Sequence, residues 1–307
     1  MRDAAPRAGH RRILYGPYGL RSGWRILAFL LLNAGAATVA VTLAVALGAP
    51  RDSTTSFAVM LGAALLAGWG MLVYVDRRPA GALGFALEPA AARDSAAGLG
   101  VGAAMLAGAV AVLAMASMAR WVADEGTVPE YVAAIASSFA FLAVAAAAEE
   151  ALFRGYAFQA LVQGIGVWPA VLGTSALFAM MHGNNPNVTP VALANIFLAG
   201  VMLAVAYLRT RSLWFATGVH LGWNWTMASL LDFPVSGIVM DVPLYTGRET
   251  GPDWMTGGAF GPEAGLAASL TIVLGTAWMW RTKWLGESPR MRAVRPLVDD
   301  RIGQARP

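Results

Sequence analysis

The sequence predicts an all-α membrane protein, a bundle of about eight transmembrane helices that encloses a cavity. Of its 307 residues, 57% are hydrophobic and only 13% are charged, whereas a soluble globular protein carries about 25% charged residues. The apolar residues are gathered into eight stretches, and most of these are near the ~20 residues that a helix needs to cross a bilayer. Composition and spacing together indicate a polytopic membrane protein.

The first apolar stretch, Ile26–Ala49, has 24 residues without a charge. The core of a signal peptide runs to about 15 residues, so this stretch is expected to remain as an uncleaved span. Six arginines precede it in a basic N-terminal arm, residues 1–25, which is expected to be cytoplasmic. The further predicted spans are Ser56–Val75, Ala96–Ala119, Val132–Val162, Trp168–His182, Pro190–Leu208, Leu213–Leu231 and Ala264–Trp280.

These spans set the domain boundaries. Residues 26–285 are predicted to form one transmembrane domain, whose polar motifs lie in a core from 132 to 231. Residues 286–307 are predicted to be a basic C-terminal tail, loosely ordered from Pro289 onward. The longest outer loop, Leu231–Gly265, is rich in Gly, Pro and acidic residues and is predicted to cover the mouth of the bundle.

The positions of the cationic residues support the count of eight spans. When the chain is threaded from a cytoplasmic N-terminus, eighteen of the 22 arginine and lysine residues fall inside, and only Arg51, Arg120 and Arg248 fall outside. The positive-inside rule expects this asymmetry. Because the cations form no separate domain, the net charge of +4 indicates membrane topology, and no nucleic-acid partner is expected. The chain has no cysteine, which excludes disulfides and thiolate metal sites.

Three charges interrupt the fourth span. Glu149, Glu150 and Arg154 lie within six residues of one another, and a charge in hydrocarbon costs about 2.5–3.5 kcal/mol on insertion scales. Glu150 and Arg154 are four residues apart with the acid first, which favours an ion pair on one helical face. Glu149 is rotated from Glu150 by about 100°, so it is expected to face a cavity. The alternative interpretation is a buried ion cluster that only fixes helix packing.

Two further spans carry polar groups. His182 ends the short fifth span, and a Gly-Asn-Asn-Pro sequence then breaks the helix, so irregular backbone there would line a wet cavity. His220 and Asn224 are four residues apart on one face of the seventh span. Gly218 and Gly222 have the same spacing and would let another helix approach closely. Each site alone is equally well explained by hydrogen bonding between helices.

Together these groups match what the activation of water requires. A glutamate can accept a proton, histidines can orient water or hold a metal, and an amide can donate to a developing oxyanion. Threading places His182 toward the outer end of its span, whereas Glu149 and His220 lie nearer the middle. The helices must therefore tilt, or the fifth span must begin deeper, for these groups to meet.

The three motifs resemble the signature of a known family. Glu149-Glu150-x-x-x-Arg154, Phe178-x-x-x-His182 and His220-x-x-x-Asn224 are similar, in order, to the motifs of the CPBP family, the CAAX-protease and bacteriocin-processing intramembrane endopeptidases, also labelled Abi. A looser likeness to some bacterial members covers Thr256–Glu263. That stretch is interpreted as a turn and a helix start, with Pro262 in the first turn.

The resemblance implies hydrolysis of a peptide bond within the membrane, in a catalytic cavity inside the bundle. Glu149 would activate water with support from Glu150 and Arg154, His182 would help to position water or substrate, and His220 with Asn224 would stabilise the oxyanion. The substrate would be a membrane-associated peptide or protein, prenylated in some cases, and the location would be the bilayer of a bacterial inner membrane.

The resemblance leaves the metal requirement open, because the family has been described both as metalloproteases and as glutamate-dependent proteases. If a divalent metal such as zinc is bound, Glu149, His182 and His220 are its expected ligands, since three such ligands suffice for a catalytic zinc site. No HExxH helix is present.

Two other functions compete with proteolysis. A proton-coupled transporter would use the glutamates and histidines as a relay, although no internal repeat of the kind found in many transporters is visible. A non-enzymatic immunity or scaffold protein would use the same polar cluster to join helices.

Overall fold

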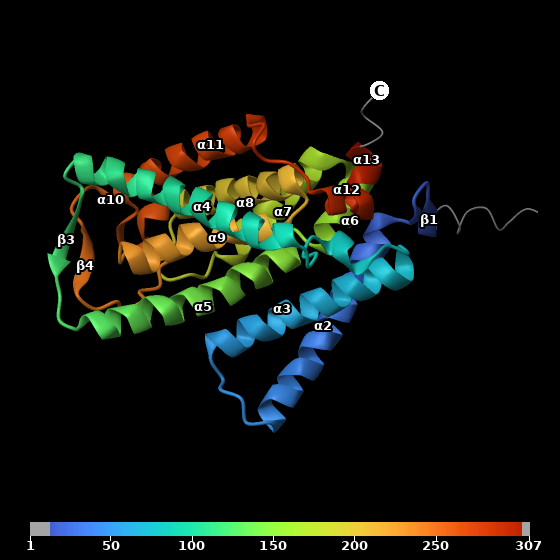
Figure 1. Ribbon diagram of the computed structural model, residues 1–307, viewed down its shortest axis with the longest axis horizontal. Coiled ribbons are helices and arrows are strands. Elements are labelled where there is room, and N and C mark those ends of the chain that lie inside the picture. Colours follow the sequence, from blue (N-terminus) through green and yellow to red (C-terminus); the bar gives the residue numbers. More distant parts are fainter. Residues whose placement is uncertain (1–12, 303–307) are drawn as a thin grey trace, which may run out of the picture.

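Long apolar helices form most of the protein, as the composition predicts. The computed structural model describes residues 13–302, and it is mainly helical, with two small two-stranded sheets that the all-α prediction did not include (Figure 1). The principal helices are α2 (Ser22–Ala46), α3 (Ser53–Gly70), α4 (Pro89–Met115), α5 (Val128–Phe153), α6 (Tyr156–Ile165), α7 (Val167–Met181), α8 (Pro190–Thr210), α9 (Leu213–Trp225) and α11 (Leu266–Arg281). The π-helical turns η1 (Met71–Val75) and η3 (Thr226–Leu230) extend α3 and α9.

Five helical segments are long and apolar enough to cross a membrane. They are Ser22–Ala46, Ser53–Val75, Pro89–Met115, Val128–Ile165 and Pro190–Thr210. The other three predicted spans also form helices, namely α7, α9 and α11, but these are shorter, with 15, 13 and 16 residues. The predicted count of eight transmembrane helices is therefore not confirmed.

The predicted span Val132–Val162 is divided into two helices. Helix α5 ends at Phe153, Arg154 and Gly155 form a turn, and α6 begins at Tyr156. A Cβ atom on Gly155 would lie 2.1 Å from the carbonyl oxygen of Ala151, so this turn requires a residue without a side chain. The turn ends α5 directly after the Glu-Glu-x-x-x-Arg motif.

Helices α4 and α9 pack backbone against backbone. A Cβ atom on Gly222 would lie 2.1 Å from the carbonyl oxygen of Leu99, and one on Gly102 would lie 2.0 Å from that of Val219. The close helix contact expected at Gly218 and Gly222 is thus confirmed, with α4 as the partner. Because His220 and Asn224 lie on α9, this packing also places them.

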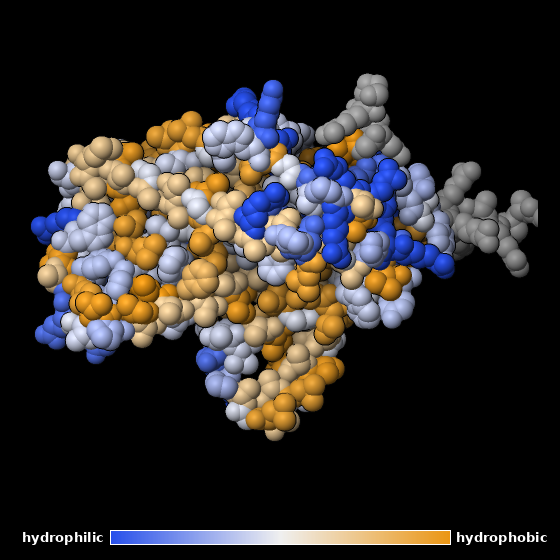
Figure 2. All heavy atoms as spheres, viewed as in Figure 1, coloured by the Kyte–Doolittle hydropathy of each residue, from blue (hydrophilic) through white to orange (hydrophobic). Residues whose placement is uncertain are grey.

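Short elements cover the two ends of the bundle. At one end β3 (Ala119–Ala123) pairs antiparallel with β4 (Tyr245–Glu249). The long loop that carries β4 also contains α10 (Asp253–Thr256), η4 (Gly258–Phe260) and η5 (Pro262–Ala264). At the other end lie β1 (Tyr15–Gly16), β2 (Gly19–Leu20) and the C-terminal helices (Figure 1). Hydrophilic side chains gather at these two ends, whereas hydrophobic ones cover the α2–α3 hairpin (Figure 2).

Residues 289–302 of the predicted loose tail are ordered, which corrects the prediction for this part, whereas residues 303–307 lie outside the described residues. The ordered part forms α12 (Pro289–Val294) and α13 (Leu297–Ile302), and Leu297 and Val298 are buried in the main core. Asp299 accepts a hydrogen bond of 2.9 Å from Arg211, and Asp300 one of 2.7 Å from Gln163. These pairings to buried side chains, together with apolar burial, outweigh the polar composition of the segment.

Candidate active site

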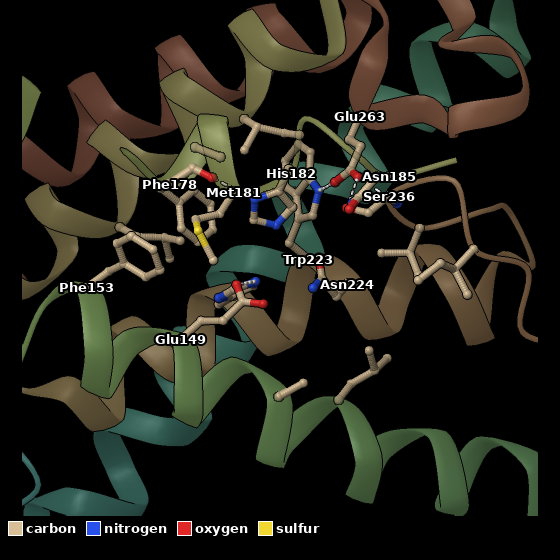
Figure 3. A pocket seen from close by; sticks show the side chains of 18 of the residues that line it. Glu149, Phe153, Phe178, Met181, His182, Asn185, Trp223, Asn224, Ser236 and Glu263 are labelled. Atoms are coloured by element: carbon tan, nitrogen blue, oxygen red, sulfur yellow. Dashed lines mark hydrogen bonds and ion pairs between the residues drawn. The ribbon is translucent and has the colours of Figure 1, made fainter. Parts of the chain in front are cut away.

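A cavity of about 340 Å³ lies between α5, α7, α9 and the loops of the β3–β4 end. Four of the six residues predicted to form the site line it: Glu149, His182, His220 and Asn224 (Figure 3). The three motifs therefore meet in one place, although threading separated them in depth. The other two predicted residues, Glu150 and Arg154, lie behind the cavity wall.

Glu150 is the centre of a buried charge cluster. Its side chain is 0% exposed, and its Oε1 accepts a hydrogen bond of 3.0 Å from Arg154 Nη1. The same oxygen lies 3.0 Å from Nδ1 of His220. Because a carboxylate oxygen accepts, Nδ1 carries the proton, and Nε2 is the ring nitrogen left for other partners. The expected ion pair between Glu150 and Arg154 is present, and it also holds the ring of His220.

Arg154 reaches the second motif through Phe178. Its guanidinium carbon lies 4.6 Å from the centre of the Phe178 ring, a cation–π geometry. Its Nη2 donates to the carbonyl oxygen of Gly200 at 3.1 Å. The Phe178 ring also packs against His182, at 4.7 Å between ring centres. The phenylalanine of the second motif thus separates the buried cation from the cavity.

Glu149 differs from its neighbour in having few partners. Its side chain is 18% exposed and points into the cavity (Figure 3). Its Oε2 has no hydrogen-bond partner in the described part of the chain and lies 3.8 Å from Nε2 of His220. This distance is too long for a direct hydrogen bond and suits two groups that share a bridging molecule. Helical rotation explains why adjacent glutamates have such different surroundings.

His182 is the C-cap residue of α7. Its Nδ1 lies 2.7 Å from the carbonyl oxygen of Phe178, one turn earlier. Since a carbonyl only accepts, this contact assigns the proton to Nδ1 and leaves Nε2 for the cavity. The ring is therefore oriented by the end of its own helix.

The predicted ligand set does not form a metal site. Within residues 13–302, no three histidine or carboxylate side chains are grouped so that they could hold a metal ion. Glu149, His182 and His220 all line the cavity, and because Nδ1 of each histidine is hydrogen-bonded, Nε2 is the ring nitrogen left for other partners. Such Nδ1 bonds are common in metal-binding histidines, so it is the grouping of the side chains, and not the histidine tautomers, that does not match a metal centre.

Glu263 is a cavity residue whose role the sequence interpretation missed. It belongs to the Thr256–Glu263 stretch, which the sequence interpretation assigned to a turn and a helix start. The stretch does form η4 and η5 ahead of α11, but the Glu263 carboxylate lines the cavity on the side opposite Glu149 (Figure 3). Ser236 and Trp223 also line it. One signal in the sequence could have indicated it, namely the acidic residue that follows the glycines in the Thr256–Glu263 stretch.

Apolar side chains form the rest of the cavity wall. Phe57 and Met60 come from α3, and Phe141, Leu142 and Leu152 come from α5. Since α3 and α5 are both long apolar helices, this wall continues into the part of the molecule expected to lie in hydrocarbon.

Comparison with known proteins identifies the segment that holds the motifs. Residues 131–226 match the family model of the Rce1-like type II CAAX prenyl endopeptidases. This segment runs from the first turn of α5 to the first residue of η3 and contains all three motifs. Searches of curated proteins and of solved structures gave no match. The chain is thus similar to the Rce1-like type II CAAX prenyl endopeptidases over the segment that holds its three motifs, and its long apolar helices indicate an integral membrane protein.

Proposed function

We propose that this protein is an intramembrane endopeptidase that hydrolyses a peptide bond with water activated by Glu149. One observation carries the proposal: an unpaired carboxylate oxygen of Glu149 lies in a cavity opposite two imidazole rings and an amide. The match of residues 131–226 to a peptidase family supports it.

The gap between Glu149 Oε2 and His220 Nε2 is the proposed position of the attacking water. At 3.8 Å, one water can contact both atoms. Glu149 removes a proton from the water, and the hydroxide adds to the carbonyl carbon of the substrate. When the tetrahedral intermediate collapses, the C–N bond breaks and Glu149 returns the proton to the leaving amine, so the products are a carboxylate and an amine.

Three neighbouring side chains would surround the carbonyl oxygen on which negative charge develops, with Asn224 as its direct donor. Asn224 lies one helical turn after His220 on α9 and can donate through its amide. His220 is held in place by Glu150, so its ring need not reorganise during the reaction. His182, on the facing helix, completes a polar surface around the reacting bond.

The substrate we propose is a membrane-associated peptide, prenylated or otherwise close to the bilayer. The apolar wall from α3 and α5 supports this assignment, because an extended substrate could lay a hydrocarbon group against it while its peptide bond reaches Glu149. We also propose that the protein lies in a bacterial inner membrane with both termini in the cytoplasm, as the arginine distribution indicates.

The decisive experiment uses the full-length protein in lipid nanodiscs with a fluorescent isoprenylated peptide and an unmodified membrane peptide. Replacing Glu149 with Gln should lower kcat by at least about 10²-fold, since proton transfer contributes about 10²–10⁴. Alanine at His182 or His220 should also reduce cleavage.

The control is Glu130→Gln, which alters an exposed acid in the first turn of the same helix and should leave cleavage unchanged. Equal cleavage by the wild type and all three site variants would refute the proposal. Proton flux in liposomes without a peptide product would favour the transporter alternative.

A further inference from the structure

A second cavity, with a volume of about 570 Å³, lies apart from the active site. Its lining comes from α3, from residues 80–87, which include the short helix η2 (Ala80–Leu83), and from single residues of α5, α9 and α12. None of these residues lines the active-site cavity. All of them are apolar except Arg290. A cavity of this size with apolar walls and one polar group is typical of a ligand site.

The wall formed by residues 80–87 is held in place by the helices behind it. Gln159, buried in α6, donates from Nε2 to the carbonyl oxygens of Ala82 and Leu83 at 3.0 Å each. The indole N–H of Trp214, on α9, donates to the carbonyl oxygen of Ala86 at 3.1 Å. Because these bonds fix the backbone of the wall, it cannot fold inward and close the cavity.

Exposed apolar side chains border the cavity. Trp69 of α3 is 43% exposed and Leu87 is 79% exposed, and both contribute to the lining. Water finds few hydrogen-bond partners in such a space, so these walls favour a hydrocarbon chain. The segment Ser53–Val75, which contains α3, is long and apolar enough to cross a membrane. The surrounding bilayer is therefore the nearest source of an occupant.

Arg290 is the one charged residue in the described lining. It lies in α12, which is anchored because its N-cap Ser288 donates to Glu88 at 2.7 Å and accepts from the backbone N–H of Met291 at 3.1 Å. Nη1 of Arg290 donates to the carbonyl oxygen of Leu87 at 3.0 Å. A guanidinium has five N–H donors, so the remaining donors can bind a phosphate.

The charge and the apolar walls are arranged as they are in a lipid. Helix α12, with Arg290, lies at the end of the bundle that we propose to be cytoplasmic (Figure 1). The lining on α3 extends from Trp69 to Leu61, which is about 12 Å along a helix axis. The cation therefore lies at the polar end and the apolar walls run deeper. Anionic headgroups of the cytoplasmic leaflet attract cations at this level.

We propose that this cavity binds one anionic phospholipid, whose phosphate contacts Arg290 and whose acyl chain lies along α3. The inference does not depend on peptidase activity. Ala147 of α5 and Trp214 of α9 also line the cavity, so the lipid fills a space between α3 and the two helices that carry Glu149 and His220. Because it binds the folded protein, the lipid raises the stability of that state.

The test is native mass spectrometry of the full-length protein in detergent, titrated with phosphatidylglycerol or with phosphatidylcholine of the same acyl chains. The wild type should bind one phosphatidylglycerol at least about fivefold more tightly, since one arginine near an anionic headgroup contributes about that factor. Arg290→Gln should remove this preference. Arg292→Gln, at an exposed arginine of the same helix that does not line the cavity, is the matched control and should keep it.

A second pair of variants tests the apolar walls. Leu61→Trp enlarges a side chain that lines the cavity and should weaken the binding of phosphatidylglycerol. Leu66→Trp makes the same change on α3 at a residue that is 61% exposed and outside this cavity, and should leave binding unchanged. Thermal unfolding gives an independent readout, because phosphatidylglycerol should raise the midpoint of the wild type and of both controls more than that of Arg290→Gln or Leu61→Trp.

The outcomes decide between the possible occupants. Equal affinities of the wild type for the two lipids would overturn the proposal, and so would unchanged phosphatidylglycerol binding in Arg290→Gln. Displacement of the lipid by the isoprenylated peptide would assign the cavity to the hydrocarbon group of the substrate, and a lipid-free dimer would assign it to a second copy of the chain. Either result would overturn the proposal as well. None of these measurements requires cleavage, so the result is independent of that of Glu149→Gln.

Discussion

The two histidines of the cavity are supported in different ways. His220 receives its support from within the helix bundle, through a hydrogen bond of 3.0 Å to Glu150, which Arg154 neutralises. His182 receives its support from the end of its own helix, and loops at one end of the bundle hold the cavity residue Glu263. The support of His220 depends on helix packing, whereas the hold on Glu263 depends on the folding of loops.

This difference separates contacts that stabilise the whole fold from contacts that orient side chains in the cavity. The α5–α9 contact buries charges that cannot be exposed or unpaired without a large cost. The loop contact is held by hydrogen bonds and close glycine approaches at one end of the bundle, where local opening is easier. Breaking the first should therefore lower the stability of the whole protein, whereas breaking the second should reduce activity more than stability.

The largest effect is expected from Arg154→Ala. This change leaves Glu150 buried without its cation, and breaking a buried ion pair costs about 3–5 kcal/mol. The unfolding free energy in detergent should fall by that amount. Arg93→Ala is the control, because the Arg93–Asp94 pair has an arginine side chain that is 70% exposed and such pairs contribute about 0–1 kcal/mol. Equal unfolding free energies for the two variants would contradict the expected difference between a buried and an exposed ion pair.

The next effect tests the helix contact that carries His220. Gly222→Ala places a Cβ 2.1 Å from the Leu99 carbonyl oxygen, so α4 and α9 must separate. Overpacking of this kind costs about 1–3 kcal/mol. Gly100→Ala is the control: it lies on α4, where an added Cβ would meet no atom within 4 Å, so the change should be neutral or slightly stabilising. Thermal unfolding midpoints of the two variants measure the difference, and a stable Gly222→Ala variant would show that the helices can move apart freely.

The third prediction concerns the loop side. Asn195→Ala removes two hydrogen bonds to the backbone around Glu263, at about 1 kcal/mol each. The unfolding free energy should therefore fall by about 1–2 kcal/mol, and kcat should fall more than this loss of stability explains. Asn184→Ala, at an exposed turn residue, is the control. A variant with normal kcat would show that the anchoring of Glu263 does not matter to catalysis.

The smallest effect is a pH dependence of the loop end. Burial raises the pKa of Glu249, at the end of β4, to about 7 from its ordinary value of 4.5. The folded protein therefore binds more protons than the unfolded chain between these values, and this contribution to stability is lost as the pH rises through about 7. Unfolding midpoints measured from pH 4.5 to 8 should fall less steeply in Glu249→Gln. Parallel profiles for the two proteins would contradict the assignment.

Much of the bundle side was predictable from the residues alone. The spacing of Glu150 and Arg154 predicted their ion pair, helical rotation predicted that Glu149 faces a cavity, and the glycine pair on α9 predicted a close helix neighbour. All three are present. Each depends on the regular periodicity of one helix, which is a local property of the chain.

The loop side and the chain ends were not predictable in the same way. Glu263 was assigned to a helix start, the tail from Pro289 was expected to be loose, and the fourth span was expected to continue past Gly155. In the first two cases distant contacts decide, because Ser236 and Asn195 hold Glu263 while Arg211 and Gln163 hold α13, and no spacing rule indicates these partners. In the third case the turn at Gly155 depends on a close backbone approach to Ala151.

The sequence by itself determined that this is a membrane protein, where its apolar helices lie and which three motifs it carries, because hydrophobicity and helical periodicity are properties of short stretches of the chain. Only the tertiary structure decided that the motifs share one cavity, that Glu150 hydrogen-bonds to His220, and that Glu263 lines the same cavity from a loop. The physical reason is that a hydrogen-bonded carboxylate or a close backbone approach forms between segments far apart in the chain, and its geometry exists only once they have packed.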